Sequence, residues 1–297
     1  MRQRLTAWGY LAGWTVLCRL PEPVARGLFR LAADVAWWRN GAGSRRLAAN
    51  LRRVVGPDLP AAELRRLVRA GLRSYARYWL ETFRLPVTSA ERIVTGARTV
   101  NQEGLERAYA AGRGVIVALP HTGNWDHAGA WAVLLGMPFT TVAERLDPAV
   151  LFDRFVAYRE SLGMEVLPLT GGARPAFQVL AERLRAGRLV CLLGDRDLSR
   201  RGIEVNFFGG RTRMPAGPAL LAVRTGAPLL PTSLWYQGRD WGIRIHDPID
   251  VPSGGSVTER VAAMTQRLAD AFAEGIAAHP QDWHMLQRVW LDGKPAR

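Results

Sequence analysis

The chain has 297 residues, 48% of them hydrophobic and 22% charged, a composition typical of a globular protein with one large domain or two small ones. Its two cysteines lack metal-ligand or CxxC spacing, which argues against a disulfide framework and a zinc site, and no apolar run reaches the roughly 20 residues that a membrane span needs. Lys and Arg exceed Asp and Glu by 40 − 26 = 14, nearly all of it Arg, which indicates either a compositional bias or an anionic partner.

The chain begins with MRQRLTAWGYLAGWTVLCRLPEP, in which Arg2 and Arg4 precede an apolar stretch. This start resembles a signal peptide but has no A-x-A-like cleavage site, and more helical pattern follows it. We interpret it as a helix ended by two prolines. Its aromatic residues Trp8, Tyr10 and Trp14 either lie in a membrane interface or pack in the core.

Apolar residues at helical spacing predict helices over residues 24–39, 45–56 and 60–86, so that residues 1–112 are mostly helical. Arginine recurs on the faces of these helices. Most of these faces are expected to be solvated, and some could face anionic lipid.

From residue 113 strands and helices alternate along the chain. We expect strands in GVIVALP, FTTVAE, EVLPLT, LVCLLG, PLLPTSLWY and GIRIHDPI. We expect helices in NWDHAGAWAVLLG, PAVLFDRFVAYRESLG, PAFQVLAERLRAG, MPAGPALLAVRTG (with Pro215 in its first turn) and VTERVAAMTQRLADAFAEGIAAHP. This order predicts the α/β class, with a largely parallel central sheet and helices on both faces. The whole chain, 1–297, is expected to be one domain with a helical part, 1–112, and an α/β core, 113–297.

His121 follows the end of the apolar run GVIVALP, where open α/β sheets bind their ligands. Gly123 permits a positive φ or a close approach, and Asn124 is a candidate N-cap for the next helix. The free N–H groups of residues 122–125 would then point at the same place, which suits an oxyanion or a phosphate.

Asp126 lies in the first turn of that helix, where its carboxylate could reach back to the imidazole of His121 and fix its tautomer. The alternative is a capped helix with a hydrogen-bonded histidine and no catalytic role. No G-x-S-x-G elbow or paired cysteine supplies a nucleophile, so His121 is expected to act directly on a substrate hydroxyl. The other histidines, His127 above all, are expected to be structural, and we expect no metal and no cofactor.

Several blocks occur in the order typical of one enzyme family. They are PHTGNWDHAG (120–129), AERLDP (143–148), YRESLGMEVLPL (158–169), LLGDRDLSRRGIEVNFFGG (192–210) and RMPAGPALLAVRTGAPLLP (213–231). H-T-G-N-W-D matches the H-x4-D motif of glycerolipid acyltransferases. The ordered set resembles the bacterial lipid A lauroyl/myristoyl acyltransferases and, more closely, the phosphatidylinositol mannoside acyltransferases.

The resemblance implies an O-acyltransferase that moves a fatty acyl chain from acyl-CoA, a donor substrate, to a hydroxyl of a glycolipid acceptor. The expected acceptor is a mannose of a phosphatidylinositol mannoside. His121 matches the family's catalytic base and Asp126 its H-x4-D partner. Asp195, in the DRDL block, matches an acidic residue that orients the base and is often Glu in the family. The sequence leaves open whether Asp126 or Asp195 is the main partner of His121.

Four further polar residues fall in the matching blocks. Glu144 and Arg159 are expected near the acceptor pocket, where they could pair; the alternative is a salt bridge that only ties a strand to a helix. Arg196 and Asp197 follow a strand end and could contact an acceptor phosphate or sugar, or pair structurally.

These substrates are amphiphilic, so we expect a monomeric, peripheral protein on the cytoplasmic face of the cell membrane, bound to an anionic membrane surface. A lauroyl/myristoyl transferase for a lipid A precursor, or for another lysolipid, is the nearest alternative. A thioesterase or hydrolase is less favoured. So is a nucleic-acid-binding protein, because the sequence has no recognised DNA- or RNA-binding motif, and no specific nucleic acid is expected.

Overall fold

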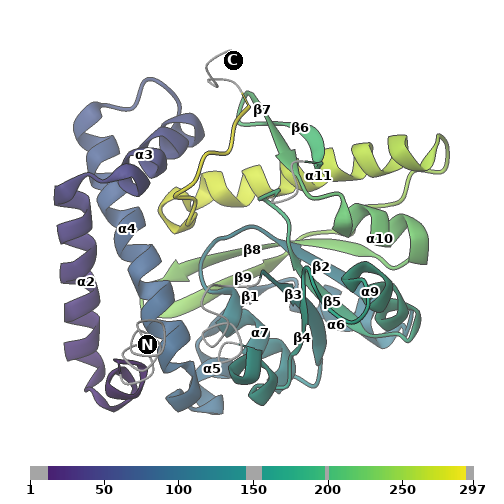
Figure 1. Ribbon diagram of the computed structural model, residues 1–297, viewed down its shortest axis with the longest axis horizontal. Helices are drawn as coiled ribbons and strands as arrows, with labels where there is room; N and C mark the ends of the chain where they lie inside the picture. The colour runs from purple at the N-terminus through teal and green to yellow at the C-terminus, as the bar shows by residue number, and fades with distance from the viewer. Residues whose placement is uncertain (1–12, 145–155, 198–200, 292–297) are drawn as a thin grey trace.

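Figure 1 shows the computed structural model, which describes residues 13–144, 156–197 and 201–291. A seven-stranded sheet in the order β1-β9-β8-β2-β5-β3-β4 lies at its centre. The strands are β1 (Ala97–Val100), β2 (Val115–Leu119), β3 (Phe139–Ala143), β4 (Glu165–Pro168), β5 (Leu189–Leu193), β8 (Leu229–Gln237) and β9 (Asp240–Ile245). Every neighbouring pair is parallel except β8 with β9, so the predicted largely parallel sheet is confirmed.

Helices cover both faces of this sheet, as predicted. They include α5 (Ala90–Thr95), α6 (Gln102–Ala110), α7 (Trp125–Leu134), α9 (Ala176–Arg185), α10 (Gly217–Thr225) and α11 (Val257–Ala278). In β2 the side chains of Ile116 and Ala118 join the core beneath α9, α10 and α11. Those of Val117 and Leu119 join the core beneath α7. A strand buried on both faces explains the uninterrupted apolar run of this segment.

The predicted N-terminal helices are present as α2 (Glu22–Arg39), α3 (Ala42–Val55) and α4 (Ala61–Arg84). Figure 1 shows α2 packed outside α4, at one side of the molecule. The expectation that residues 1–112 are mostly helical missed β1, which pairs with β9 at the edge of the sheet. Its four residues are too few to show an alternating pattern.

One aromatic residue of the predicted interfacial helix packs in the core. Residues 13–19 are helical, and Trp14 is buried, with its indole N–H donating to the carbonyl of Phe83 over 2.8 Å. The core alternative therefore holds for Trp14. Arg2, Arg4, Trp8 and Tyr10, the other residues of the interfacial prediction, lie outside the described part of the chain.

Two more elements differ from the predictions. Strands β6 (Ile203–Phe207) and β7 (Gly210–Met214) form a separate antiparallel hairpin that the sequence did not reveal. Helix α10 begins at Gly217, so Pro215 precedes the helix, and Pro218 occupies its first turn instead. Across the described residues, no helix is both long and apolar enough to span a bilayer.

Candidate active site

Two neighbouring strands position a histidine and an aspartate. Leu119 of β2 lies opposite Leu193 of β5, and the amide of Gly194 donates to the carbonyl of Leu119 over 2.9 Å. His121 and Asp195 each follow the paired leucine by two positions, at the carboxyl edge of the sheet. Parallel register therefore brings the two side chains together although they are far apart in sequence, at the edge where open α/β sheets bind ligands.

The His121 ring and the Asp195 carboxylate form a tight pair. Nδ1 of His121 lies 2.6 Å from Oδ1 of Asp195, and the backbone amide of His121 donates to Oδ2 over 3.0 Å. Burial opposes the charge on Asp195. The attraction of His121, its hydrogen bonds and one from the indole of Trp283 outweigh that effect and lower the pKa of Asp195. A charged carboxylate on Nδ1 leaves Nε2 of the partly exposed ring as the proton acceptor.

A segment near the C-terminus, residues 282–288, passes beside His121 and is called the strap below. Thr122 and Trp283 form an antiparallel bridge, flanked by two backbone hydrogen bonds of 3.0 and 2.8 Å. Trp283 is fully buried and its Nε1–H donates to Oδ2 of Asp195 over 3.0 Å. The strap therefore helps to fix the carboxylate. The only feature of the sequence that pointed to a role for this segment in fixing Asp195 is its content of aromatic residues, in DWHMLQRVW (282–290).

A buried chain of hydrogen bonds fastens the strap to α4. The Ser74 hydroxyl donates to Oδ1 of Asp282 over 2.7 Å and lies 2.9 Å from Nε2 of His284. Burial, and then the nearby His121, lower the pKa of His284 to about 3, so its ring is neutral. Since the serine proton is given to Asp282, the Nε2–H of His284 donates to the serine oxygen.

Asp126 has a different position from the one predicted. Its carboxylate is almost fully buried and accepts two hydrogen bonds from Arg159, of 2.7 and 3.3 Å. Tyr78 and Thr82 of α4 donate to the same carboxylate over 3.0 and 3.4 Å. Desolvation disfavours the Arg159 charge, but Asp126 outweighs it and raises the pKa of Arg159. Asp195, not Asp126, contacts the imidazole of His121.

The remaining polar residues divide between a cleft and the protein's own loops. Glu144 and Arg159 both line a cleft beside His121, but they do not form the pair that was expected. Glu144 instead pairs with Arg196 over 3.2 Å, and Arg196 also lines the cleft. Asp197 accepts a hydrogen bond of 2.8 Å from the amide of Gly202 and is not among the described residues that line the cleft.

The connection from β2 to α7 has the predicted turn. Gly123 has φ +54, and a Cβ there would lie 2.9 Å from the backbone of Leu234, so the site excludes any side chain. Asn124 is the N-cap of α7, accepting from the amide of His127, and it also donates to Glu81 over 3.0 Å. Asn124 is thus buried as a structural residue.

The cleft beside His121, called the His121 cleft, has a volume of about 280 Å³. Aromatic rings of α4, the start of α7, the ends of β3 and β5 and the strap line it. Its lining includes Tyr75, Tyr78, Trp79, His121, Trp125, Glu144, Arg159, Arg196 and His284.

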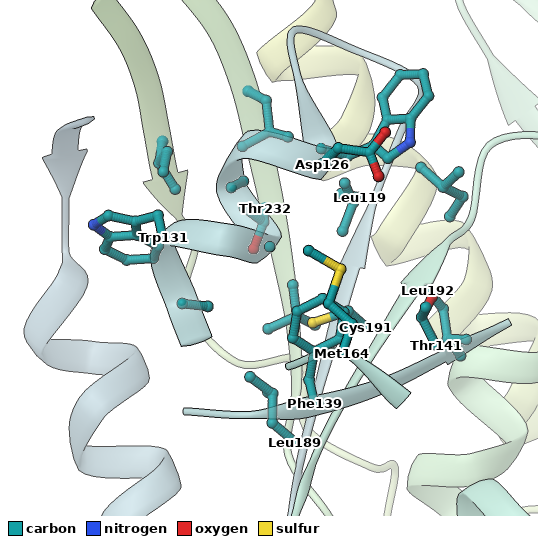
Figure 2. A pocket seen from close by; sticks show the side chains of 18 of the residues that line it. Leu119, Asp126, Trp131, Phe139, Thr141, Met164, Leu189, Cys191, Leu192 and Thr232 are labelled. Atoms are coloured by element: carbon teal, nitrogen blue, oxygen red, sulfur yellow. The ribbon is translucent and has the colours of Figure 1, made fainter. Parts of the chain in front are cut away.

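A second, apolar cavity of about 100 Å³ adjoins this cleft, because Trp125, Val142, Arg159 and Leu193 line both. It lies between α7 and the sheet. Figure 2 shows the Asp126 carboxylate toward one end of this cavity and Phe139 and Leu189 toward the other. Among the described residues that line it, Asp126 and Arg159 alone are charged.

Residues 1–292 match the family described as bacterial lipid A biosynthesis acyltransferase. The chain is 52% identical to a phosphatidylinositol mannoside acyltransferase of Mycolicibacterium smegmatis over 288 residues, covering 97% of this chain and 92% of the relative. It is also 52% identical to a phosphatidylinositol mannoside acyltransferase of Mycobacterium tuberculosis, covering 96% of this chain and 89% of that relative.

Proposed function

The chain belongs to the bacterial lipid A biosynthesis acyltransferase family, and from that premise we propose that it transfers a fatty acyl chain from acyl-CoA to a mannose hydroxyl of a phosphatidylinositol mannoside. The observation that carries the proposal is the His121–Asp195 pair, which opens on a cleft joined to an apolar cavity. The names of the two relatives support the choice of acceptor.

His121 acts as the general base in this reaction. Nε2 takes the proton of the acceptor hydroxyl as its oxygen bonds to the thioester carbonyl carbon, and the C–S bond then breaks. The departing thiolate takes up the proton, so the ring returns to its neutral form. Asp195 holds Nδ1 and stabilises the transient imidazolium, while Trp283 keeps the carboxylate in place.

The oxyanion that forms on the carbonyl needs hydrogen-bond donors, and the backbone amides of residues 122–125 are the candidates. The amides of Thr122 and Gly123 already donate to the carbonyls of Pro120 and Asp282, over 2.7 and 3.0 Å. We therefore assign the role to the amides of Asn124 and Trp125 at the start of α7, where the helix dipole also favours negative charge.

The apolar cavity is the site for the acyl chain. It adjoins the His121 cleft and is lined by leucine, valine, phenylalanine and methionine side chains between α7 and the sheet. An acyl chain lying there would place its thioester carbonyl next to the base. Each methylene group buried there contributes about 0.8 kcal/mol to binding.

The exposed face of α2 supports action at a membrane surface. Val24, Leu28, Leu31, Val35 and Trp38 follow helical spacing along this face, and Trp38 is 77% exposed. Exposed arginines of the same helix flank this stripe. Apolar side chains beside basic ones are typical of helices that lie on anionic bilayers, and both proposed substrates are amphiphilic.

The function is tested by offering purified protein labelled acyl-CoA with a panel of phosphatidylinositol mannosides, lysophospholipids and lipid A precursors. We expect product from the mannosides and a loss of about 10²–10⁴-fold for His121→Ala, the usual contribution of a general base. Transfer to a lipid A precursor alone would support the lauroyl/myristoyl alternative. Free fatty acid released without any acceptor would support a hydrolase.

Membrane binding is tested by sedimentation with anionic liposomes. The variant Leu28→Gln/Leu31→Gln/Trp38→Gln should bind more than about tenfold more weakly, because each apolar side chain buried contributes roughly 1.5–3 kcal/mol. The matched control, Val94→Gln/Val100→Gln/Leu134→Gln, alters exposed apolar residues on other elements and should bind as the wild type does. Equal losses in both variants would contradict a role of the α2 face.

A further inference from the structure

A third hollow, of about 380 Å³, lies beside the strap. Three arginines, two alanines and one asparagine line it, and this set is called the arginine hollow. Its members are Ala42, Arg45, Arg46, Ala49, Asn50 and Arg288. None of these six side chains is acidic, so the three positive charges have no carboxylate among the described lining residues.

Arginines elsewhere in the N-terminal helices contrast with this set. Arg69 and Arg73 of α4 both bind the carboxylate of Asp34, over 2.7 and 2.6 Å. In the hollow, Arg45 donates one hydrogen bond of 2.6 Å to the backbone carbonyl of Asn40. A guanidinium has five N–H donors, so most of its donors remain for a ligand.

The N-terminus of α3 contributes to the same hollow. Ala42, its first residue, lines the hollow, no side chain caps the helix at Gly41, and its first turn has no acidic residue. The free N–H groups and the dipole there favour an anion. Arg45, at the end of this turn, opposes the dipole, and a bound anion would offset that repulsion.

The strap joins the hollow to the His121 cleft. The side-chain amide of Asn50 donates to the carbonyls of Met285 and Gln287, over 2.7 and 2.8 Å. Gln287 lines the His121 cleft, and its neighbour Arg288 lines the hollow. The four-residue step from His284, which binds the backbone of His121, spans at most about 14 Å, so the two sites are close.

From this arrangement we propose that the arginine hollow binds a phosphate group of a substrate whose reacting end lies in the His121 cleft. A planar guanidinium group can donate two parallel hydrogen bonds to two oxygens of one phosphate, and the helix N-terminus adds backbone donors. The ligand's identity rests on the proposed function, in which both substrates carry phosphate: the nucleotide part of acyl-CoA and the phosphodiester of the phosphoinositide acceptor.

The experiment measures equilibrium binding by titration calorimetry, without turnover. The probes are coenzyme A, dephospho-coenzyme A, pantetheine and glycerophosphoinositol. The variant is Arg45→Gln/Arg46→Gln/Arg288→Gln. The matched control, Arg113→Gln/Arg185→Gln/Arg224→Gln, removes three exposed arginines, before β2 and at the ends of α9 and α10. Circular dichroism checks that each variant is folded.

We expect the triple variant to bind at least one phosphate-bearing probe about tenfold or more weakly, as for the loss of charge-assisted hydrogen bonds, with pantetheine binding unchanged. Weaker binding of coenzyme A assigns the hollow to the donor, and a smaller effect with dephospho-coenzyme A identifies the 3′-phosphate. Weaker binding of glycerophosphoinositol assigns it to the acceptor.

Wild-type affinity for every phosphate-bearing probe in the triple variant would overturn the proposal. So would an equal loss in the control, or no binding of any phosphate-bearing probe by the wild type. These outcomes are independent of acyl transfer. A protein that fails to acylate mannosides but loses coenzyme A binding in the triple variant would refute the proposed function and leave the phosphate site standing.

Discussion

Two buried aspartates near His121 differ in the groups that their carboxylates bind. Asp126, five positions along the chain, is held by Arg159 and two hydroxyl groups beneath α4. Asp195, seventy-four positions away, contacts the imidazole and the indole of Trp283. The nearer residue in sequence is thus a structural partner of an arginine, and the farther one is the partner of the candidate base.

Each carboxylate positions the group to which it is hydrogen-bonded. Asp126 fixes the Arg159 side chain at the wall shared by the His121 cleft and the apolar cavity. Asp195 fixes a proton on His121. Changing the first should affect stability most, and changing the second should affect turnover most.

The largest effect is expected for Asp195→Asn. Without the carboxylate the imidazolium loses its stabilising charge and Nδ1 its fixed proton, so turnover should fall by roughly 10²–10⁴-fold while the protein stays folded. Initial rates of acyl transfer measure this. Asp195→Glu is the control, because it keeps the charge, and it should retain more activity than the amide variant. Wild-type turnover in Asp195→Asn would refute the assignment.

Asp126→Asn should lower the free energy of unfolding by about 3–5 kcal/mol, because it leaves the Arg159 charge buried and unpaired. Urea denaturation followed by circular dichroism measures this. Adding Arg159→Met removes the unpaired charge, so the double variant should recover most of the stability. A double variant as unstable as Asp126→Asn would show that the pair is not the reason for the loss.

The histidines sharpen the same contrast at acid pH. Burial lowers the pKa of His127 and of His284 to about 3 in the folded protein, from an ordinary 6.5. Below pH 6.5 the unfolded chain therefore binds more protons. The stability that each neutral histidine preserves is fully present above pH 6.5 and is lost as the pH falls toward 3. Between pH 7 and 5, protonation of each histidine in the unfolded chain should lower the free energy of unfolding by about 2 kcal/mol.

Urea denaturation of the wild type and of His127→Gln at both pH values tests this expectation. The ring of His127 stacks on that of Trp241, with 3.7 Å between the ring centroids, and it lies away from the base. The variant therefore removes the titration of one buried histidine. The loss of stability between pH 7 and 5 should be smaller in the variant by about 2 kcal/mol. An identical loss in both proteins would mean that His127 does not titrate on unfolding.

Much of the fold could be predicted from local patterns. The run GVIVALP predicted β2 because a strand buried on both faces must be apolar throughout, and Asn124 capped α7 as its residue type and position suggested. The short β1 and the β6–β7 hairpin escaped prediction, because a few residues with mixed side chains do not distinguish strand from loop. Trp14 was ambiguous because burial depends on what packs against it.

By itself the sequence determined the order of the longer strands and helices, the place of His121 at a strand end and the family to which the ordered motifs point. These follow from short-range periodicity and from residue types at fixed spacing. Only the tertiary structure decided that Asp195 contacts the histidine and that Trp283 contacts Asp195, while Asp126 binds Arg159. Those contacts depend on the register of β2 with β5 and on the return of the strap, and interactions between distant segments leave no local pattern in the chain.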